Sequence, residues 1–153
     1  MPVLLYKNVL KLPFLFPGNF IRKIFERNSS SNAWKGGIFT YHHYHSNTHK
    51  ALGIYRDKTK IKLGGEMGSV MEIQKGDVLI IPAGVAHKNL GNENQIGVIG
   101  AYPGGKNYDI KCRRKVERQQ AEINIQNVLL PSTDPVWGAF LGVVKIWNNG
   151  LDK

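Results

Sequence analysis

The sequence has almost no cysteine and no long apolar segment, and each absence excludes a class of protein. Cys112 is the only cysteine among 153 residues, so no disulfide forms within the chain and a disulfide-stabilised secreted scaffold is excluded. A membrane-spanning helix needs about 18 consecutive apolar residues, and prolines and charges interrupt every candidate segment. Pro13 and Pro17 break the apolar N-terminal segment, and no signal-peptide cleavage pattern follows. We therefore expect a cytoplasmic protein without a membrane span.

Acidic residues are also scarce, above all in the first part of the chain. The sequence has 21 Lys and Arg against 11 Asp and Glu, a formal net charge of +10, and Glu26 and Asp57 are the only acids within residues 1–62. Such a surplus could follow the phosphates of a nucleic acid. However, lysines alternate with less polar residues over 58–63, which is typical of a strand with one solvated face. We interpret the surplus as a solvated surface and do not expect nucleic-acid binding.

The length and the 42% hydrophobic content predict one domain, residues 1–153, around a single core. We expect an N-terminal arm and helix over 1–35, a sheet-rich core over 36–105 and a C-terminal extension over 106–153 that packs back onto the core. The helix is predicted over 20–28, where apolar residues recur at helical spacing between charged ones. These apolar positions are Phe20, Ile21, Ile24 and Phe25.

From Gly36 onward, short runs of β-branched and aromatic residues alternate with Gly, Asp and Asn. This texture is typical of an antiparallel barrel or sandwich. The predicted strands are 37–45, 51–56, 59–63, 69–74, 77–81, 86–90 and 95–101. No helical periodicity interrupts this block. The predicted fold class is therefore all-β, a small antiparallel β-barrel with a short N-terminal helix and a C-terminal tail packed on it.

The histidines are clustered, and this clustering is the main functional signal. Four of the five stand within residues 42–49, and His87 stands alone further along the chain. Side chains alternate along a strand, so His43 and His45 are expected on one face together with Tyr41. His87 follows a buried strand and a Pro-x-Gly turn that can direct it toward the same interior. Three imidazoles from two segments form a ligand set for a divalent metal, which makes His43, His45 and His87 the candidate ligands.

Both histidine segments resemble the paired motifs of the cupin superfamily. In the first motif a glycine, here Gly37, precedes His-x-His by five residues, and His43 and His45 match. In the second motif a glycine precedes Pro-x-Gly by five residues and a histidine follows after two more. Gly76, Pro82, Gly84 and His87 match that spacing in register. More narrowly, residues 25–102 and the segment 134–136 resemble the YjlB-like bacterial cupins.

This resemblance implies a double-stranded β-helix of the jelly-roll type, often a homodimer, with a metal ion inside the barrel. It does not fix a reaction, because cupins include dioxygenases, isomerases, decarboxylases and sugar-binding modules. The metal is equally open among Fe, Zn, Mn and Ni, since imidazole suits each of them.

The chain departs from the cupin pattern at its most chemically informative position. The resemblance places a metal-binding Glu at position 50, where this chain has Lys50, and a closing Gly at 57, where it has Asp57. An ammonium about 4 Å from a divalent ion is repelled by about 8 kcal/mol at an effective dielectric constant near 20. Lys50 must therefore swing outward, lose its proton or replace the metal. We expect it to swing outward and three neutral histidines to hold the ion.

Two functions from different classes follow. The first is a metal-dependent enzyme, dioxygenase-like or isomerase-like, that acts on a small anionic molecule through the three-histidine centre. Lys50 and Tyr41 are its candidate catalytic residues, with core packing as the alternative for Tyr41, and His49 is a weaker candidate for a replacement ligand. The second is a degenerate, metal-free cupin that binds a small molecule or a partner without catalysis.

Overall fold

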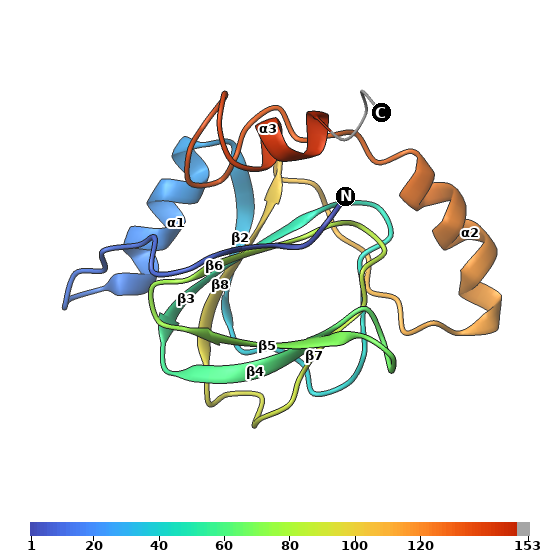
Figure 1. Cartoon of the computed structure of the whole chain (residues 1–153), viewed down its shortest axis with the longest axis horizontal. Coiled ribbons are helices and arrows are strands. Elements are labelled where there is room, and N and C mark those ends of the chain that lie inside the picture. Colours follow the sequence, from blue (N-terminus) through green and yellow to red (C-terminus); the bar gives the residue numbers. More distant parts are fainter. Residues whose placement is uncertain (150–153) are drawn as a thin grey trace.

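The computed structural model describes residues 1–149 and contains two antiparallel sheets (Figure 1). The larger sheet has the order β1-β6-β3-β8-β2 and the smaller one β5-β4-β7. Their strands are β1 (Leu4–Tyr6), β2 (Ser30–Gly36), β3 (Lys50–Arg56), β4 (Lys58–Leu63), β5 (Ser69–Gln74), β6 (Val78–Ile81), β7 (His87–Asn89) and β8 (Gly97–Pro103). The helices are α1 (Pro17–Arg27), α2 (Lys115–Gln126) and α3 (Val143–Asn148). None of the helices within residues 1–149 is long and apolar enough to cross a membrane.

Strand β3 shows how the sequence divides its side chains between two cores. Leu52 and Ile54 belong to an apolar cluster that also holds Ile61 of β4 and Ile73 of β5, so this cluster fills the space between the sheets. Ala51 belongs instead to the cluster on the other side of the larger sheet. Because side chains alternate along a strand, every even-numbered position from 50 to 54 faces the space between the sheets.

The helices cover different parts of the molecule. Ile21 and Phe25 of α1 and Val143 and Trp147 of α3 are buried against the outer face of the larger sheet. Helix α2 lies on the side of the molecule opposite α1 in Figure 1. It buries a single residue, Ala121, in a small cluster beside the histidine segment. The C-terminal extension therefore packs on the larger sheet through α3 and on the histidine segment through α2.

The antiparallel sheets predicted from the sequence are confirmed, and one predicted strand is wrong. Strands β3 to β8 lie within the predicted ranges or differ by a few residues at their ends. Residues 37–45 form no strand, because this segment leaves β2 and bonds in turn to two different partners. His43 and His87 exchange backbone hydrogen bonds of 3.1 and 2.9 Å, while Tyr44 exchanges bonds of 3.0 and 2.9 Å with Lys111. The sequence also gave no indication that β2 begins at Ser30.

The predicted helix is confirmed, but the all-β class is wrong for the C-terminal extension. Helix α1 begins at Pro17, where the fixed backbone of proline suits the first turn, three residues before the predicted start. Helices α2 and α3 were not predicted. Helix α2 buries one residue and has polar side chains on most of its surface, so no apolar stripe marks it in the sequence. The antiparallel core is thus accompanied by three helices.

Candidate functional site

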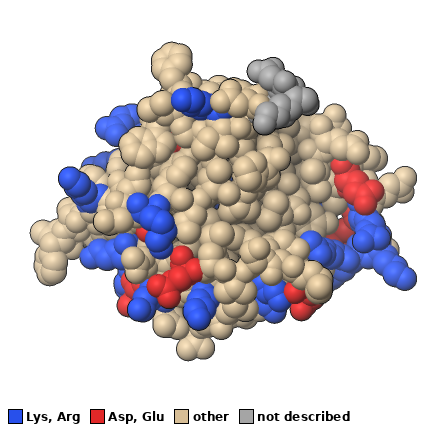
Figure 2. Space-filling model, viewed as in Figure 1, with Lys and Arg blue, Asp and Glu red and all other residues tan. Residues whose placement is uncertain are grey.

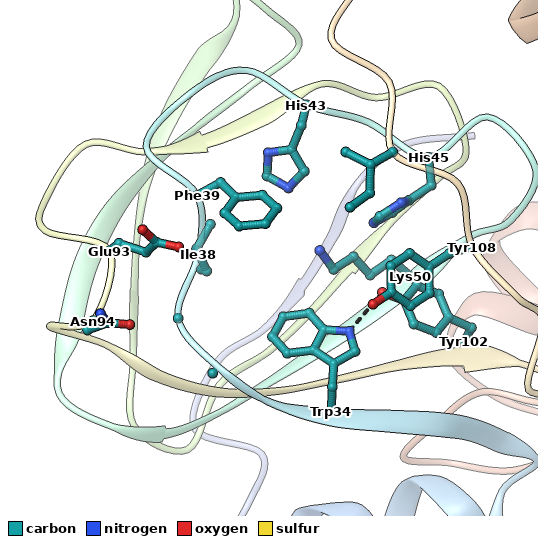
Figure 3. Close-up of a pocket in the computed structure, with 13 residues that line it drawn as sticks. Trp34, Ile38, Phe39, His43, His45, Lys50, Glu93, Asn94, Tyr102 and Tyr108 are labelled. Carbon is teal, nitrogen blue, oxygen red and sulfur yellow. Dashed lines mark hydrogen bonds between the residues drawn. The ribbon is translucent and has the colours of Figure 1, made fainter.

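A cavity of about 390 Å³ opens beside the two histidine motifs (Figure 3). Its lining comes from β2, the 37–45 segment, β3, β8 and two loops. The side chains that line it are Trp34, Ile38, Phe39, His43, His45, Lys50, Glu93, Asn94, Tyr102, Tyr108 and Ile110. This volume falls within the range of small-molecule sites, and the walls are largely aromatic with a few polar groups among them.

The structure brings the three predicted histidines together. The ring centroids of His43 and His87 are 4.1 Å apart, and that of His45 lies 6.2 Å from His43 and 6.0 Å from His87. All three side chains are buried. The spacing of the two motifs therefore predicted a real cluster, although its role as a metal-ligand set stays a prediction.

Backbone carbonyls fix the tautomer of each histidine. The Nδ1 atoms of His43, His45 and His87 lie 3.1, 2.5 and 3.1 Å from the carbonyl oxygens of Tyr41, Asp109 and Val85. A carbonyl only accepts, so each Nδ1 carries the hydrogen and each Nε2 keeps a free electron pair.

The environment also keeps the three imidazoles neutral. Burial, followed by the charge of Lys50, lowers the pKa of His43 to about 4 and that of His45 to about 3. The same causes lower the pKa of His87 well below its usual value. Near pH 7 each ring is therefore an acceptor at Nε2.

Lys50 occupies the interior, and the prediction that it swings outward is wrong. Only 4% of this residue is exposed, and its Nζ lies 3.3 Å from His87 Nε2 and 5.2 Å from the centroid of the Trp34 ring. The reason is the alternation of β3, which puts position 50 on the same side as Leu52. Figure 3 shows the amino group directed into the cavity between His43 and Trp34.

Within residues 1–149, no carboxylate compensates the charge of Lys50. None of the ion pairs within residues 1–149 involves it. Burial lowers the pKa of Lys50 to about 7, because an ammonium loses its hydration in the interior. The cavity therefore has an amino group at its inner wall that is partly charged near neutral pH.

These residues do not fit a divalent metal as they are arranged. Neutral imidazoles with Nδ1 bonded to carbonyls are the usual state of metal ligands, and His45 Nε2 is buried without a hydrogen-bond partner. Against this, the electron pair of His87 faces the amino group of Lys50. Among the described residues, no group of three or more His, Cys, Asp or Glu side chains has an arrangement that could hold a metal ion.

His49 and Tyr41 lie outside the cavity lining. His49 Nδ1 accepts a 3.0 Å hydrogen bond from the Ala83 amide, and Nε2 lies 3.2 Å from the Leu129 carbonyl. Both ring nitrogens are thus engaged, so the alternative of His49 as a replacement ligand is wrong. Tyr41 is 49% exposed and stacks on Phe39 at 4.9 Å between ring centroids. This position gives no support to a catalytic role for Tyr41.

The buried His49 predicts an acid sensitivity of the fold. Burial lowers its pKa to about 4, below the unfolded value of 6.5, so the unfolded chain binds more protons between these pH values. The free energy of unfolding should therefore fall as the pH drops from 6.5 to 4, and His49 should contribute about 3 kcal/mol to that fall. Denaturant unfolding of the wild type and His49→Gln at several pH values measures this share. An identical pH dependence in both proteins would contradict it.

Three residues that shape the site were not predicted. Trp34 Nε1 donates a 2.8 Å hydrogen bond to the Tyr102 hydroxyl, and the indole lies so close to Gly100 that any side chain there would collide with it. Tyr108 stacks on Tyr102 at 4.3 Å between ring centroids.

The third is Asp109, which positions a histidine. Its carbonyl holds the His45 ring, while its carboxylate accepts hydrogen bonds from the Ser46 amide, at 2.7 Å, and from the Ser46 hydroxyl. No motif marks the 106–111 segment, since these contacts depend on the tertiary fold.

Basic and acidic side chains are mixed on one face of the molecule. On the face shown in Figure 2, Lys and Arg side chains are interspersed with Asp and Glu and form no continuous basic surface. Two surface lysines each have an acidic side chain nearby. Lys7 forms a 2.8 Å ion pair with the buried Asp77, and the charge of Lys88 lowers the pKa of Glu66. The interpretation of the surplus as a solvated surface stays a prediction.

Comparisons with known proteins place the chain in a family. No family model matches the sequence. "Uncharacterized protein YjlB" of Bacillus subtilis (strain 168) is 40% identical over 146 residues, which cover 95% of this chain and 86% of that protein.

Solved structures show weaker similarity. The acireductone dioxygenase of Bacillus anthracis, with a cadmium ion in its active centre, is 15% identical at a TM-score of 0.48, over 69% of this chain and 80% of that one. The coconut allergen cocosin is 13% identical at a TM-score of 0.43, and the match covers 52% of this chain and 23% of the allergen. Similarity of this size supports no statement about activity. The identity to YjlB and the two motifs carry the assignment: the chain belongs to the YjlB-like family of cupins.

Proposed function

We propose that the protein binds a small anionic molecule in the cavity, with Lys50 as its cationic anchor. The observation that carries this proposal is the buried amino group, which has no carboxylate partner in the described part of the chain. An unpaired buried charge is costly, and an anion that enters the cavity supplies the missing partner. An ammonium has three N–H groups, of which His87 accepts one, so two are left for a ligand.

The walls of the cavity define the shape of the ligand. Trp34, Phe39 and Tyr102 present aromatic rings around the amino group, and such walls favour a compact, flat molecule. Among the described residues of the lining, Lys50 is the only Lys or Arg and Glu93 is the only acid. This charge balance favours a ligand with a single negative charge, such as a monocarboxylate.

Removal of the amino group tests the proposal. Thermal-shift and calorimetric titrations with a panel of small carboxylates and phosphates should identify anions that stabilise the wild type. Lys50→Met keeps the apolar stem and lacks the charge, so it should bind those anions more weakly by about tenfold or more. Lys35→Met is the matched control, because Lys35 is exposed and its Nζ lies 5.1 Å from the Tyr55 ring centroid. Equal binding by Lys50→Met and the wild type would refute the anchor.

A metal-dependent enzyme is the second candidate function. The Nδ1 hydrogen bonds of His43, His45 and His87 favour it, because they leave three Nε2 electron pairs available. It requires the Lys50 side chain to leave its position beside His87. Elemental analysis of protein purified without a histidine tag distinguishes the two candidates. Near-stoichiometric Fe, Zn, Mn or Ni would favour the enzyme, and its absence would favour the metal-free anion site.

A further inference from the structure

The Lys50 amino group also has the placement of a nucleophile. It lies on the inner wall of a cavity that opens to solvent, it has no carboxylate partner within residues 1–149, and its hydrogen-bond partner is the free Nε2 of His87. Lysines that form imines with carbonyl substrates share these features, since a desolvated amine is more readily neutral and reactive. We propose that Lys50 forms a reversible imine with a small 2-oxo carboxylic acid. This inference rests on the anion-binding function proposed above.

The carbonyl carbon of such a ligand reacts with the Lys50 nitrogen, and its carboxylate pairs with the positive charge. The Lys50 nitrogen attacks the carbonyl carbon to form a C–N bond, and the carbonyl oxygen becomes the hydroxyl of a carbinolamine. That hydroxyl then leaves as water. The balance is one ammonium plus one carbonyl compound giving one iminium plus one water, so no oxidant or reductant is needed. His87 Nε2, 3.3 Å from Nζ, is placed to pass the proton from the ammonium to the departing hydroxyl.

An oxo acid fits this site better than a neutral aldehyde or ketone. The iminium keeps the positive charge at the position of the ammonium, and the carboxylate of a 2-oxo acid is attached to the carbon that bonds to it. The attraction between the positive charge at position 50 and the ligand carboxylate is therefore preserved after the reaction.

Reductive trapping tests the imine directly. The full chain is incubated with pyruvate and sodium cyanoborohydride, and the modified residues are identified by peptide mass spectrometry. We expect a carboxyethyl group on Lys50, formed on the order of tenfold faster than on the exposed Lys35. Lactate, which has the carboxylate but no carbonyl group, should slow the trapping at Lys50 and leave the reaction at Lys35 unchanged. Equal labelling of both lysines would overturn the inference.

A charge-preserving variant tests whether the adduct needs the Lys50 amine. Lys50→Arg keeps a cation at this position but cannot form the imine, so it should show no adduct at position 50. Thermal melting of this variant checks that it folds, and Lys50→Met replaces it if it does not. Stabilisation of the wild type by pyruvate without an adduct at Lys50 would overturn the imine and leave the proposed function standing. Neither stabilisation nor an adduct, with any anion of the panel, would overturn both.

Discussion

Lys50→Glu is expected to turn the cavity into a divalent-metal site. The substitution removes the ammonium that faces His87 Nε2 at 3.3 Å and places a carboxylate on the same interior face of β3. At about 4 Å and an effective dielectric constant near 20, the interaction between two unit charges is about 4 kcal/mol. The side-chain charge at position 50 therefore interacts with each of the two charges of the ion by about this amount. Solvent and side-chain rearrangement reduce this gain, and we expect affinity for Zn²⁺ or Mn²⁺ to rise on the order of a hundredfold or more.

Calorimetric titration of wild type and Lys50→Glu with each metal measures the change. Lys50→Gln is the matched control, because it removes the positive charge without adding a carboxylate and should show a smaller gain. His87→Ala in the Lys50→Glu background should lose most of the added affinity if His87 is one of the ligands. Wild-type affinity equal to that of Lys50→Glu would mean that Lys50 does not block the ion. The metal-dependent enzyme would then become the better proposal.

The cluster of His43, His45 and His87 could be predicted because the three histidines stand in two short sequence motifs. Two motifs with fixed spacings put the histidines on segments that pair in the fold, and His43 and His87 are backbone partners in the structure. The direction of Lys50 could also have been found from sequence. Leu52 and Ile54 are apolar and share its parity on β3, so the same alternation that turns them inward turns Lys50 inward.

Other parts of the fold and site left no such signal. The contact of Asp109 with His45 joins segments that are far apart in the chain, and the polar residues around Asp109 are equally typical of an exposed loop. Helix α2 buries only Ala121, so its stability comes from contacts with the rest of the fold. Such contacts leave no helical repeat of apolar residues in the sequence. The walls of the cavity, such as Trp34 over Gly100, depend on the register of β2 with β8, which includes an irregularity between Ser31 and Trp34.

Asp134→Ala is expected to cause the largest loss of stability of any single substitution considered. Asp134 is fully buried, and its carboxylate accepts hydrogen bonds from the Tyr6 hydroxyl and from the amides of Val136, Trp137 and Val143. These bonds join the N-terminal strand β1 to the segment that leads into α3. Alanine would leave these four donors, of which the Val143 amide is buried and the others are partly buried, without their acceptor, and we expect the free energy of unfolding to fall by about 3–5 kcal/mol.

Tyr6→Phe is the matched control for this network, because it removes one donor and leaves the carboxylate with its three amides. Burial, and then the Asp134 carboxylate, raise the pKa of the Tyr6 hydroxyl, so near neutral pH it is protonated and donates to the carboxylate. The control should therefore cost about 1–2 kcal/mol. Denaturant unfolding of the wild type, Tyr6→Phe, Asp134→Ala and the double variant gives both values and their coupling. A loss for Asp134→Ala no larger than that for Tyr6→Phe would show that water satisfies the three amides, and that the Asp134 carboxylate does not hold the C-terminal segment in place.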